Sequence, residues 1–119
     1  ETSRIHAEAF SIAEVAHGPM TLIGAGDPVL AFGPMDEARA GLRDRLADFR
    51  GRGAHVIAAG LDEDVAAATL ALPGPSIGHP VLGAIAQIQS FYGLANALAL
   101  ARGLDPDQPP HLAKVTRTL

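Results

Sequence analysis

The sequence predicts an α/β fold, a three-layer α/β/α sandwich built on a parallel sheet. Two short apolar runs, PVLAF at 28–32 and HVIAA at 55–59, have the length and composition of strands that are buried on both faces. A stretch with helical periodicity separates them. Because strand, helix and strand follow one another within about 30 residues, they form a βαβ unit, in which the strands are parallel and the crossover is right-handed.

The helix that connects these two strands carries signals at both ends. Asp36 stands where an N-cap is expected, and Glu37 follows in the first turn, where the helix dipole favours a carboxylate. Gly51 and Gly53 mark its C-terminal end. Apolar residues at spacings of four, four and three form one stripe along this helix: Ala38, Leu42, Leu46 and Phe49.

Further elements are expected on both sides of this unit. Residues 68–73 predict a third strand that ends at a Pro-Gly-Pro breaker. Residues 80–102 predict a long helix, apolar nearly all round and therefore buried on more than one side, against another lobe or another subunit. Upstream, residues 5–10 are expected to form a strand and residues 11–23 a helix. The tail, 105–119, has three prolines in its first six residues, so we expect an extended arm there.

Length, charge and composition narrow the class of protein. The chain has 119 residues, enough for one domain or part of one. A formal net charge of −4 offers no basic face, so neither nucleic acid nor a membrane is expected as a partner. Cysteine is absent, which excludes a disulfide scaffold and a thiolate nucleophile. Four polar residues interrupt the apolar tract at 80–101, and no secretion signal opens the chain, so we expect a soluble, cytoplasmic protein.

Histidine and glutamate gather near the N-terminal end, but their spacing does not favour a metal site. His6 and Glu8 would share one face of a strand, and Glu14 and His17 one face of a helix. Neither pair supplies the two histidines and the carboxylate of a hydrolytic zinc site, so no metal is predicted. The glycine-rich residues 24–28 precede a strand instead of following one, and they predict a turn, not a phosphate-binding loop.

Two other residues are candidate nucleophiles. Ser76 lies near His79, but the Gly-x-Ser-x-Gly elbow of a serine hydrolase is missing. Lys114 is the only lysine, beside eight arginines. Its amine can condense with a carbonyl to form a Schiff base, which a guanidinium cannot do. Composition alone nevertheless favours a solvated residue of the tail.

Three motifs together resemble a known family. They are Glu-x-x-x-x-His-Ala-Glu-Ala at the start, Glu-x-x-His-Gly-Pro at 14–19 and Gly-Leu-Asp-x-Asp-x-Pro followed by Leu-x-Lys in the tail. With their spacing, they resemble the C-terminal half of sugar isomerase (SIS) domains. The similarity is to the isomerase part of glucosamine-fructose-6-phosphate aminotransferase and to the related amino-sugar-phosphate deaminase/isomerase branch, and it extends over essentially all of the chain.

This resemblance implies roles for four residues. Glu1 falls at the carboxylate that moves a proton between C1 and C2 of the open-chain sugar. His17 falls at a histidine that assists ring opening and reaches the site of a neighbouring subunit. Lys114 falls at the lysine that forms a Schiff base with the ketose, and Ala113 lies in the tail that folds over the substrate. The residue types fit, because a carboxylate relays protons, an imidazole titrates near neutral pH and an amine condenses with a carbonyl.

The resemblance also implies a domain organisation and partners. Residues 1–104 would be the C-terminal part of a SIS domain with flavodoxin-like topology, incomplete at its N-terminus, and residues 105–119 a tail that covers the active site. The family's sheet has five parallel strands, and its first strand and the following helix would precede Glu1. No cofactor is implied, because a carboxylate moves the proton. The implied partners are a phosphorylated hexose or amino sugar, a second copy in a homodimer and the N-terminal SIS part of the same polypeptide.

His6, Glu8 and Glu14 are expected to hold the junction between strand and helix.

Several functions remain open at this point. The ending KVTRTL differs from the Lys-Ser-Val-Thr-Val-Glu of the synthases and favours the deaminase branch or an uncharacterised SIS branch. The alternatives to an isomerase or aminotransferase are a non-catalytic module that binds a phosphosugar as a regulatory ligand, and a structural lobe that supplies a dimer face through residues 80–102.

Overall fold

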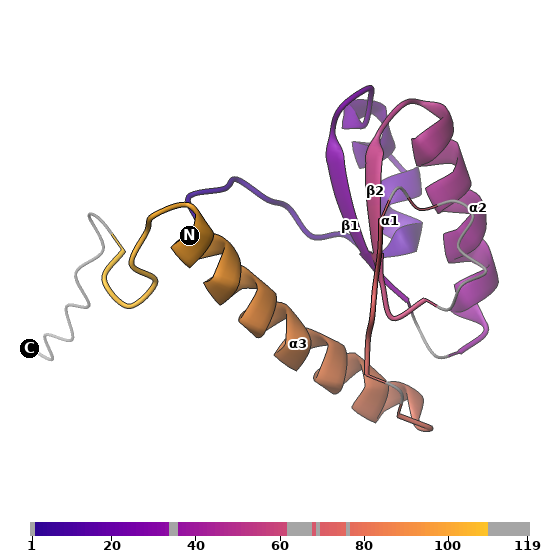
Figure 1. Cartoon of the computed structure of the whole chain (residues 1–119). Helices are drawn as coiled ribbons and strands as arrows, with labels where there is room; N and C mark the ends of the chain where they lie inside the picture. Colours follow the sequence, from indigo (N-terminus) through magenta and orange to yellow (C-terminus); the bar gives the residue numbers. More distant parts are fainter. Residues whose placement is uncertain (1, 34–35, 62–67, 69, 76, 110–119) are drawn as a thin grey trace, which may run out of the picture. The chain divides into compact units, whose positions relative to one another are not determined.

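The larger of two compact units contains the sheet. The computed structural model describes residues 2–33, 36–61, 68, 70–75 and 77–109. Contacts divide the chain into Ala9–Ser90 and a smaller unit, whose described parts are residues 2–8 and 91–109. The elements in chain order are α1 (Ile12–Ala16), η1 (Pro19–Leu22), β1 (Pro28–Phe32), α2 (Ala38–Gly51), β2 (His55–Ala59), β3 (Leu70–Leu72) and α3 (Pro80–Ala101). Figure 1 labels the three α-helices and the strands β1 and β2.

The sheet of the larger unit is parallel, as the βαβ pattern predicts. Its strand order is β1-β2-β3, and both neighbouring pairs are parallel. Val29 lies opposite Val56 and Ala31 opposite Ala58, so these residues point to the same face. The third strand is confirmed, but it is shorter than predicted and covers only Leu70–Leu72.

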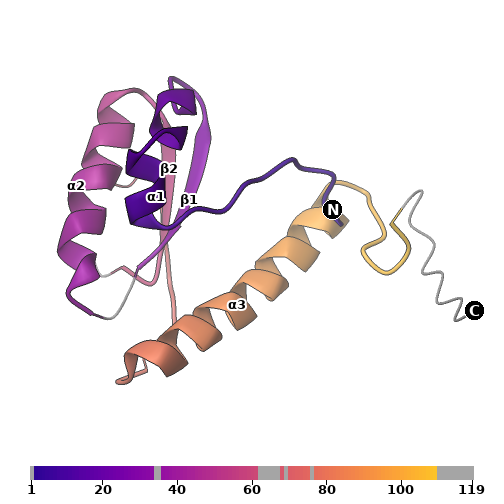
Figure 2. The same ribbon diagram turned by 180° about the vertical axis from the view of Figure 1, so that it is seen from behind.

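One face of this sheet forms the core together with α1 and α2. Val56 and Ala58 of β2 are fully buried there, and Val29 and Ala31 of β1 pack against the same cluster. The helices contribute Val15 of α1 and Leu42, Leu46 and Phe49 of α2, which confirms the predicted stripe for the three residues whose side chains are described. Figure 2 shows α1 and α2 on the same side of the strands.

The edge strand β1 differs from its prediction. Its sequence indicated a strand buried on both faces, yet Pro28 is exposed and the other four residues are only half-buried. In the described part of the sheet, β1 has β2 as its one neighbouring strand. A strand with the composition of a sheet centre thus lies at an edge here.

The N-terminal end of α2 also differs from the prediction. The N-cap is Glu37, one residue later than predicted, and it makes no capping hydrogen bond through its side chain. Asp36 instead offers its backbone carbonyl, which accepts a hydrogen bond from the Arg39 amide at 3.2 Å. The helix begins at Ala38, and this start leaves Asp36 outside the capping position.

The C-terminal ends of α2 and α3 follow their sequence signals closely. Gly53, at φ 87°, donates to Arg50 O at 2.9 Å, and the next amide, of Ala54, donates to Phe49 O at 3.1 Å. This pair of bonds is a Schellman motif, which needs the left-handed backbone that glycine adopts without strain. Gly103, at φ 71°, ends α3 in the same way.

The N-terminal region contradicts two predictions. Residues 5–10 form no strand, because the smaller unit, to which residues 5–8 belong, offers them a helix and no described strand to pair with. The predicted helix over 11–23 is two short helices. Pro19 has no amide hydrogen to continue α1, which ends at Ala16, and it opens η1 as the first residue instead.

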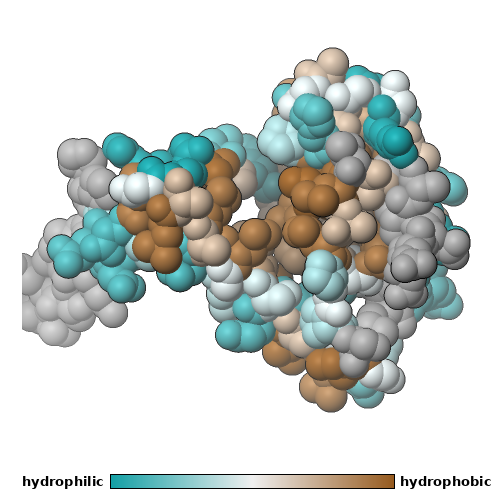
Figure 3. All heavy atoms as spheres, in the orientation of Figure 1, coloured by the Kyte–Doolittle hydropathy of each residue, from teal (hydrophilic) through white to brown (hydrophobic). Residues whose placement is uncertain are grey.

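The helix α3 has the predicted bounds within one residue, but the described chain does not bury it. Its exposed large side chains include Val81, Leu82, Ile85, Ile88, Tyr92, Leu94, Leu98 and Leu100. Apolar side chains are visible on the surface of both units in Figure 3. The burial that its composition predicts is therefore not provided by the residues that the structure describes.

In the smaller unit, the N-terminal segment is attached to the C-terminal half of α3. The hydroxyl of Ser3 donates to Ala95 O at 3.0 Å, and Ser3 is 9% exposed. Arg4 follows at φ 50°, a left-handed conformation that turns the chain. After α3 the tail bends at once, because the Asp107 amide donates to Asp105 Oδ1 at 2.9 Å, so its described start is a turn and not an extended arm.

Truncating the centre of the core tests this packing. Leu46 is 0% exposed, so Leu46→Ala should lower the free energy of unfolding by about 2–5 kcal/mol through lost burial and a cavity. Leu22 is 76% exposed, and Leu22→Ala should change the free energy of unfolding by less than about 0.5 kcal/mol. Denaturant unfolding of both variants measures the difference; equal losses would mean that the α2–β2 contact is not the core.

Candidate functional site

His17 is the one predicted site residue that the structure describes. It is the C-cap of α1, at φ −91° and ψ 6°, and its amide donates to Glu14 O at 3.0 Å. Its side chain is exposed, and η1 begins two residues later. The imidazole therefore extends into solvent from a corner between two short helices.

The helix before His17 is closed at its start by a capping box. The Ser11 amide donates to Glu14 Oε2 at 2.9 Å, and the Glu14 amide donates to Ser11 Oγ at 3.3 Å. The hydrogen bond from the Ser11 backbone, followed by that with its side chain, lowers the pKa of Glu14 below its ordinary value. Glu14 is thus a structural residue at the start of a helix, as expected, although no strand precedes it.

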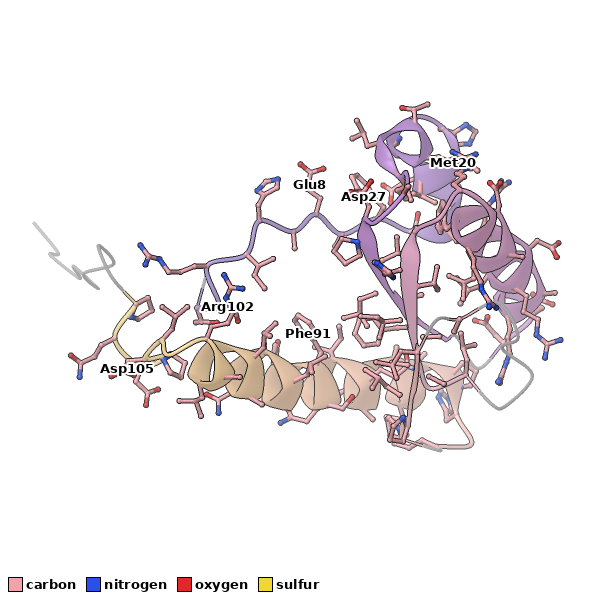
Figure 4. All side chains as sticks on the ribbon, turned by 45° about the horizontal axis from the view of Figure 1, so that its top comes forward. Glu8, Met20, Asp27, Phe91, Arg102 and Asp105 are labelled. Atoms are coloured by element: carbon pink, nitrogen blue, oxygen red, sulfur yellow. The ribbon has the colours of Figure 1, made fainter. Side chains whose placement is uncertain are left out.

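The segment after His17 is attached to α2. Arg52 Nη1 donates to Met20 O at 2.9 Å, and Arg52 also forms an ion pair with Asp48, whose Oδ2 lies 3.1 Å from Nη2. Arg45 Nη1 lies 3.8 Å from the Met20 sulfur, and the Met20 side chain packs against the core cluster. Figure 4 shows Met20 beside the end of α2. The two contacts with Met20 were not predicted, because Arg45 and Arg52 are distant from it in sequence.

A second cluster lies at the C-terminal edge of the sheet, where parallel α/β folds bind their ligands. Gly33 follows β1, Gly60 follows β2 at φ 68°, and Gly74 follows β3. A Cβ at Gly33 would lie 2.9 Å from Gly60 O, and one at Gly74 would lie 2.7 Å from Gly60 N. The strand ends approach each other too closely here for any side chain.

An amide from α3 completes this edge. Gln87 is 6% exposed, and its Nε2 donates to Gly33 O at 2.6 Å. A Cβ at Gly60 would lie 2.8 Å from the same nitrogen. Gln87 was not among the predicted site residues. A glutamine in an apolar helix was nevertheless a usable signal, because a buried amide needs a hydrogen-bond partner.

The other predicted site residues lie outside the described part of the chain: Glu1, Ala113 and Lys114. His6 and Glu8, which were expected to hold a strand–helix junction, instead form an exposed pair with 3.4 Å between Nε2 and Oε1. Residues 24–28 form the predicted turn. Its tip is Gly26 at φ 87°, and the Gly24 amide donates to Asp27 Oδ2 at 2.8 Å.

The described residues contain neither a candidate metal site nor a candidate membrane span. They contain no group of three or more His, Cys, Asp or Glu side chains that could hold a metal ion. Among the described helices, none is both long and apolar enough to cross a membrane.

Solved structures define the class of fold. The C-terminal domain of glucosamine-fructose-6-phosphate aminotransferase from Francisella tularensis matches with a TM-score of 0.78 and 29% identity, over 92% of this chain and 32% of that one. A protein from Silicibacter pomeroyi assigned as a phosphosugar isomerase matches with a TM-score of 0.77 and 38% identity, over 89% of this chain and 32% of that one. The fold is therefore the α/β sandwich of SIS domains, as predicted.

Curated relatives with similar sequences include aminotransferases. Glutamine–fructose-6-phosphate aminotransferase (isomerizing) from Vibrio cholerae is 37% identical over 121 residues, and that from Leifsonia xyli is 38% identical over 125 residues. Each alignment covers 96% of this chain but only 19% and 20% of the relative. No protein-family model matches the chain. The chain is therefore a C-terminal SIS domain, similar in sequence to about a fifth of these aminotransferases.

The capping box should be visible in a titration. Because hydrogen bonds to its charged form lower the pKa of Glu14, we expect its carboxylate to titrate below 4.5, as measured by NMR. The stabilisation of α1 is then complete above the pKa of an unfolded glutamate and is lost as the pH falls through the lower folded value. Ser11→Ala should raise the midpoint, since it removes one of the two hydrogen bonds; an unchanged midpoint would contradict the capping box.

The crowded strand ends make a separate prediction. Gly74→Ala should lower the free energy of unfolding by about 1–3 kcal/mol, because its Cβ would meet the backbone of Gly60, which cannot move aside cheaply. Gly78→Ala is the matched control, since nothing lies within 4 Å of an added Cβ there. Thermal unfolding of the two variants compares them; equal stability would mean that the strand ends are not in contact.

Proposed function

We propose that this chain is the C-terminal SIS part of an enzyme that isomerises a phosphosugar, with amino transfer or deamination. Its substrate would be fructose-6-phosphate or glucosamine-6-phosphate. The observation that carries the proposal is the identity of 37% and 38% to isomerising aminotransferases of fructose-6-phosphate, over 96% of this chain. Since the chain spans about a fifth of those relatives, the complete activity belongs to a longer protein.

The proposed chemistry assigns one step to each residue type. The amine of Lys114 adds to the ketose carbonyl and expels water, which leaves an iminium group at C2. Ammonia then displaces the lysine amine from C2, which frees Lys114 and leaves the new nitrogen on the sugar. The acidified proton at C1 passes to the Glu1 carboxylate, which returns it to C2; the C1 hydroxyl loses its proton, so that the C2–N double bond is replaced by a C1–O double bond. His17 exchanges a proton with the ring oxygen when the sugar ring opens. Ala113 lies in the tail that closes over the sugar.

Two features of the described residues support a chemical role for His17. Its imidazole is exposed, so it is accessible to a substrate or to the site of a neighbouring subunit. Its backbone is restrained by Glu14 on one side and by η1 on the other. A group that must meet a substrate benefits from such restraint, because orientation then costs less during the reaction.

The proposal includes the partners expected from the sequence. They are a phosphorylated hexose or amino sugar, a second copy in a homodimer and the N-terminal SIS part of the same polypeptide, in the cytoplasm. The exposed apolar side chains of α3 are compatible with a covering partner, because apolar surface of this kind is usually covered in the functional assembly. No metal or organic cofactor takes part in the proposed proton transfer.

Borohydride trapping tests the Schiff base. The full-length protein is reduced in the presence of fructose-6-phosphate, and mass spectrometry of the digest should show the sugar adduct on Lys114. Lys114→Arg, which keeps the positive charge but cannot form an imine, should abolish the adduct. An unlabelled wild-type protein would remove this role from Lys114.

A substitution at Glu1 separates catalysis from binding. Glu1→Gln removes the proton-relaying carboxylate but keeps its size, so isomerisation should fall by about 10²–10⁴-fold while the affinity for the sugar phosphate changes little. Turnover that survives this change would favour the non-catalytic phosphosugar-binding module instead. Binding is measured by calorimetry and turnover by the ratio of the sugar phosphates formed.

A further inference from the structure

The corner that carries His17 is attached to the rest of the larger unit on both of its sides. Two residues before His17, Val15 is 8% exposed and belongs to the core cluster. Three residues after it, Met20 packs against the same cluster through its side chain. The intervening residues His17 and Gly18 are exposed. The corner is therefore an exposed bend between two anchored points.

At the second anchor, one arginine holds the backbone of Met20. The carbonyl oxygen of Met20 accepts a hydrogen bond of 2.9 Å from Arg52 Nη1. The hydrogen bond that the same oxygen accepts from the Ile23 amide, at the end of η1, is longer, at 3.4 Å. At these lengths the contact with Arg52 is the stronger of the two. η1 has only four residues, so its own hydrogen bonds hold it weakly.

Asp48 fixes the direction of this arginine. Arg52 Nη2 lies 3.1 Å from Asp48 Oδ2, and Nε lies 3.4 Å from Oδ1, so the carboxylate faces the guanidinium edge with both oxygens. The remaining nitrogen, Nη1, is then directed at Met20 O. A planar guanidinium can serve both partners at once, which a lysine ammonium cannot do with the same geometry.

The exposed setting of this ion pair indicates that stability is not its main effect. The side chains of Arg52 and Asp48 are 37% and 40% exposed, and solvent-exposed pairs contribute little to folding. The described residues offer the His17 ring no hydrogen-bond partner of its own. The position of the imidazole is therefore set by its backbone, and the backbone after it is held by Arg52.

We infer that Arg52, oriented by Asp48, is a positioning residue for His17: it holds the Met20 carbonyl and thereby fixes the corner from which the imidazole acts on the sugar. The inference rests on the proposed function, because it requires His17 to take part in the reaction. Loss of the anchor should misplace the imidazole without removing it, and small misplacements of a reacting group lower kcat strongly.

A double-mutant cycle in the full-length protein tests this inference. Arg52→Met should lower kcat by about tenfold with KM within about twofold, whereas His17→Asn should lower kcat by about 10²-fold or more. Because Arg52 acts through His17, Arg52→Met in the His17→Asn background should lower kcat by less than about twofold. Arg43→Met, which removes the same charge from an exposed position on α2, is the matched control and should keep wild-type kcat.

Thermal unfolding of each variant separates folding from positioning. If Arg52→Met does not fold, Arg52→Lys replaces it in the cycle, since it keeps one donor for Met20 O and should lose less activity. Wild-type kcat in the folded Arg52 variant, or equal fold-losses in both backgrounds, would overturn the inference and leave the proposed function in place. Wild-type kcat in His17→Asn would overturn the role of His17 itself, and the inference with it.

Discussion

The burial of α2 against β2 is the contact on which the rest of the larger unit depends. Leu46 and Val56 are both 0% exposed, and Phe49 and Ala58 lie beside them in the same cluster. Because helix and strand are consecutive, this contact commits the chain to a crossover, and the parallel pairing of β1 with β2 follows. Val15 then attaches α1 to the same cluster, which places the His17 corner next to α2.

Polar groups act at the borders of this core, where they determine local geometry more than stability. Ser11 and Glu14 cap the start of α1. Arg52 donates a hydrogen bond to the carbonyl of Met20, and Gln87 donates one to the carbonyl of Gly33. Each joins a backbone group that the regular elements leave without a strong partner. The corner of His17 and the C-terminal edge of the sheet are organised in this way, and both belong to the unit Ala9–Ser90.

Elements with strong local signals were predicted well from the sequence. The βαβ unit, the stripe of α2, the glycine-ended C-terminus of α2 and the bounds of α3 all follow from periodicity and from residues such as Gly53. The failures fall where the outcome depends on a neighbour. An alternating segment at residues 5–10 needs a strand beside it, and the start of α2 depends on the residues that precede it. Of the candidate site, the sequence motifs predict Glu1, His17, Ala113 and Lys114; of these, His17 alone lies in the described part, and the roles of all four stay predictions.

The sequence by itself determined the class of fold and the family, because apolar periodicity, turn residues and motifs such as His-Gly-Pro are local properties of the chain. Only the tertiary structure decided which groups meet across the chain. Arg52 reaches Met20 over 32 positions and Gln87 reaches Gly33 over 54, and no local pattern encodes such pairs. They arise because packing α1, α2 and the strands around one core leaves particular carbonyls near particular side chains, and a buried carbonyl such as that of Gly33 must find a donor.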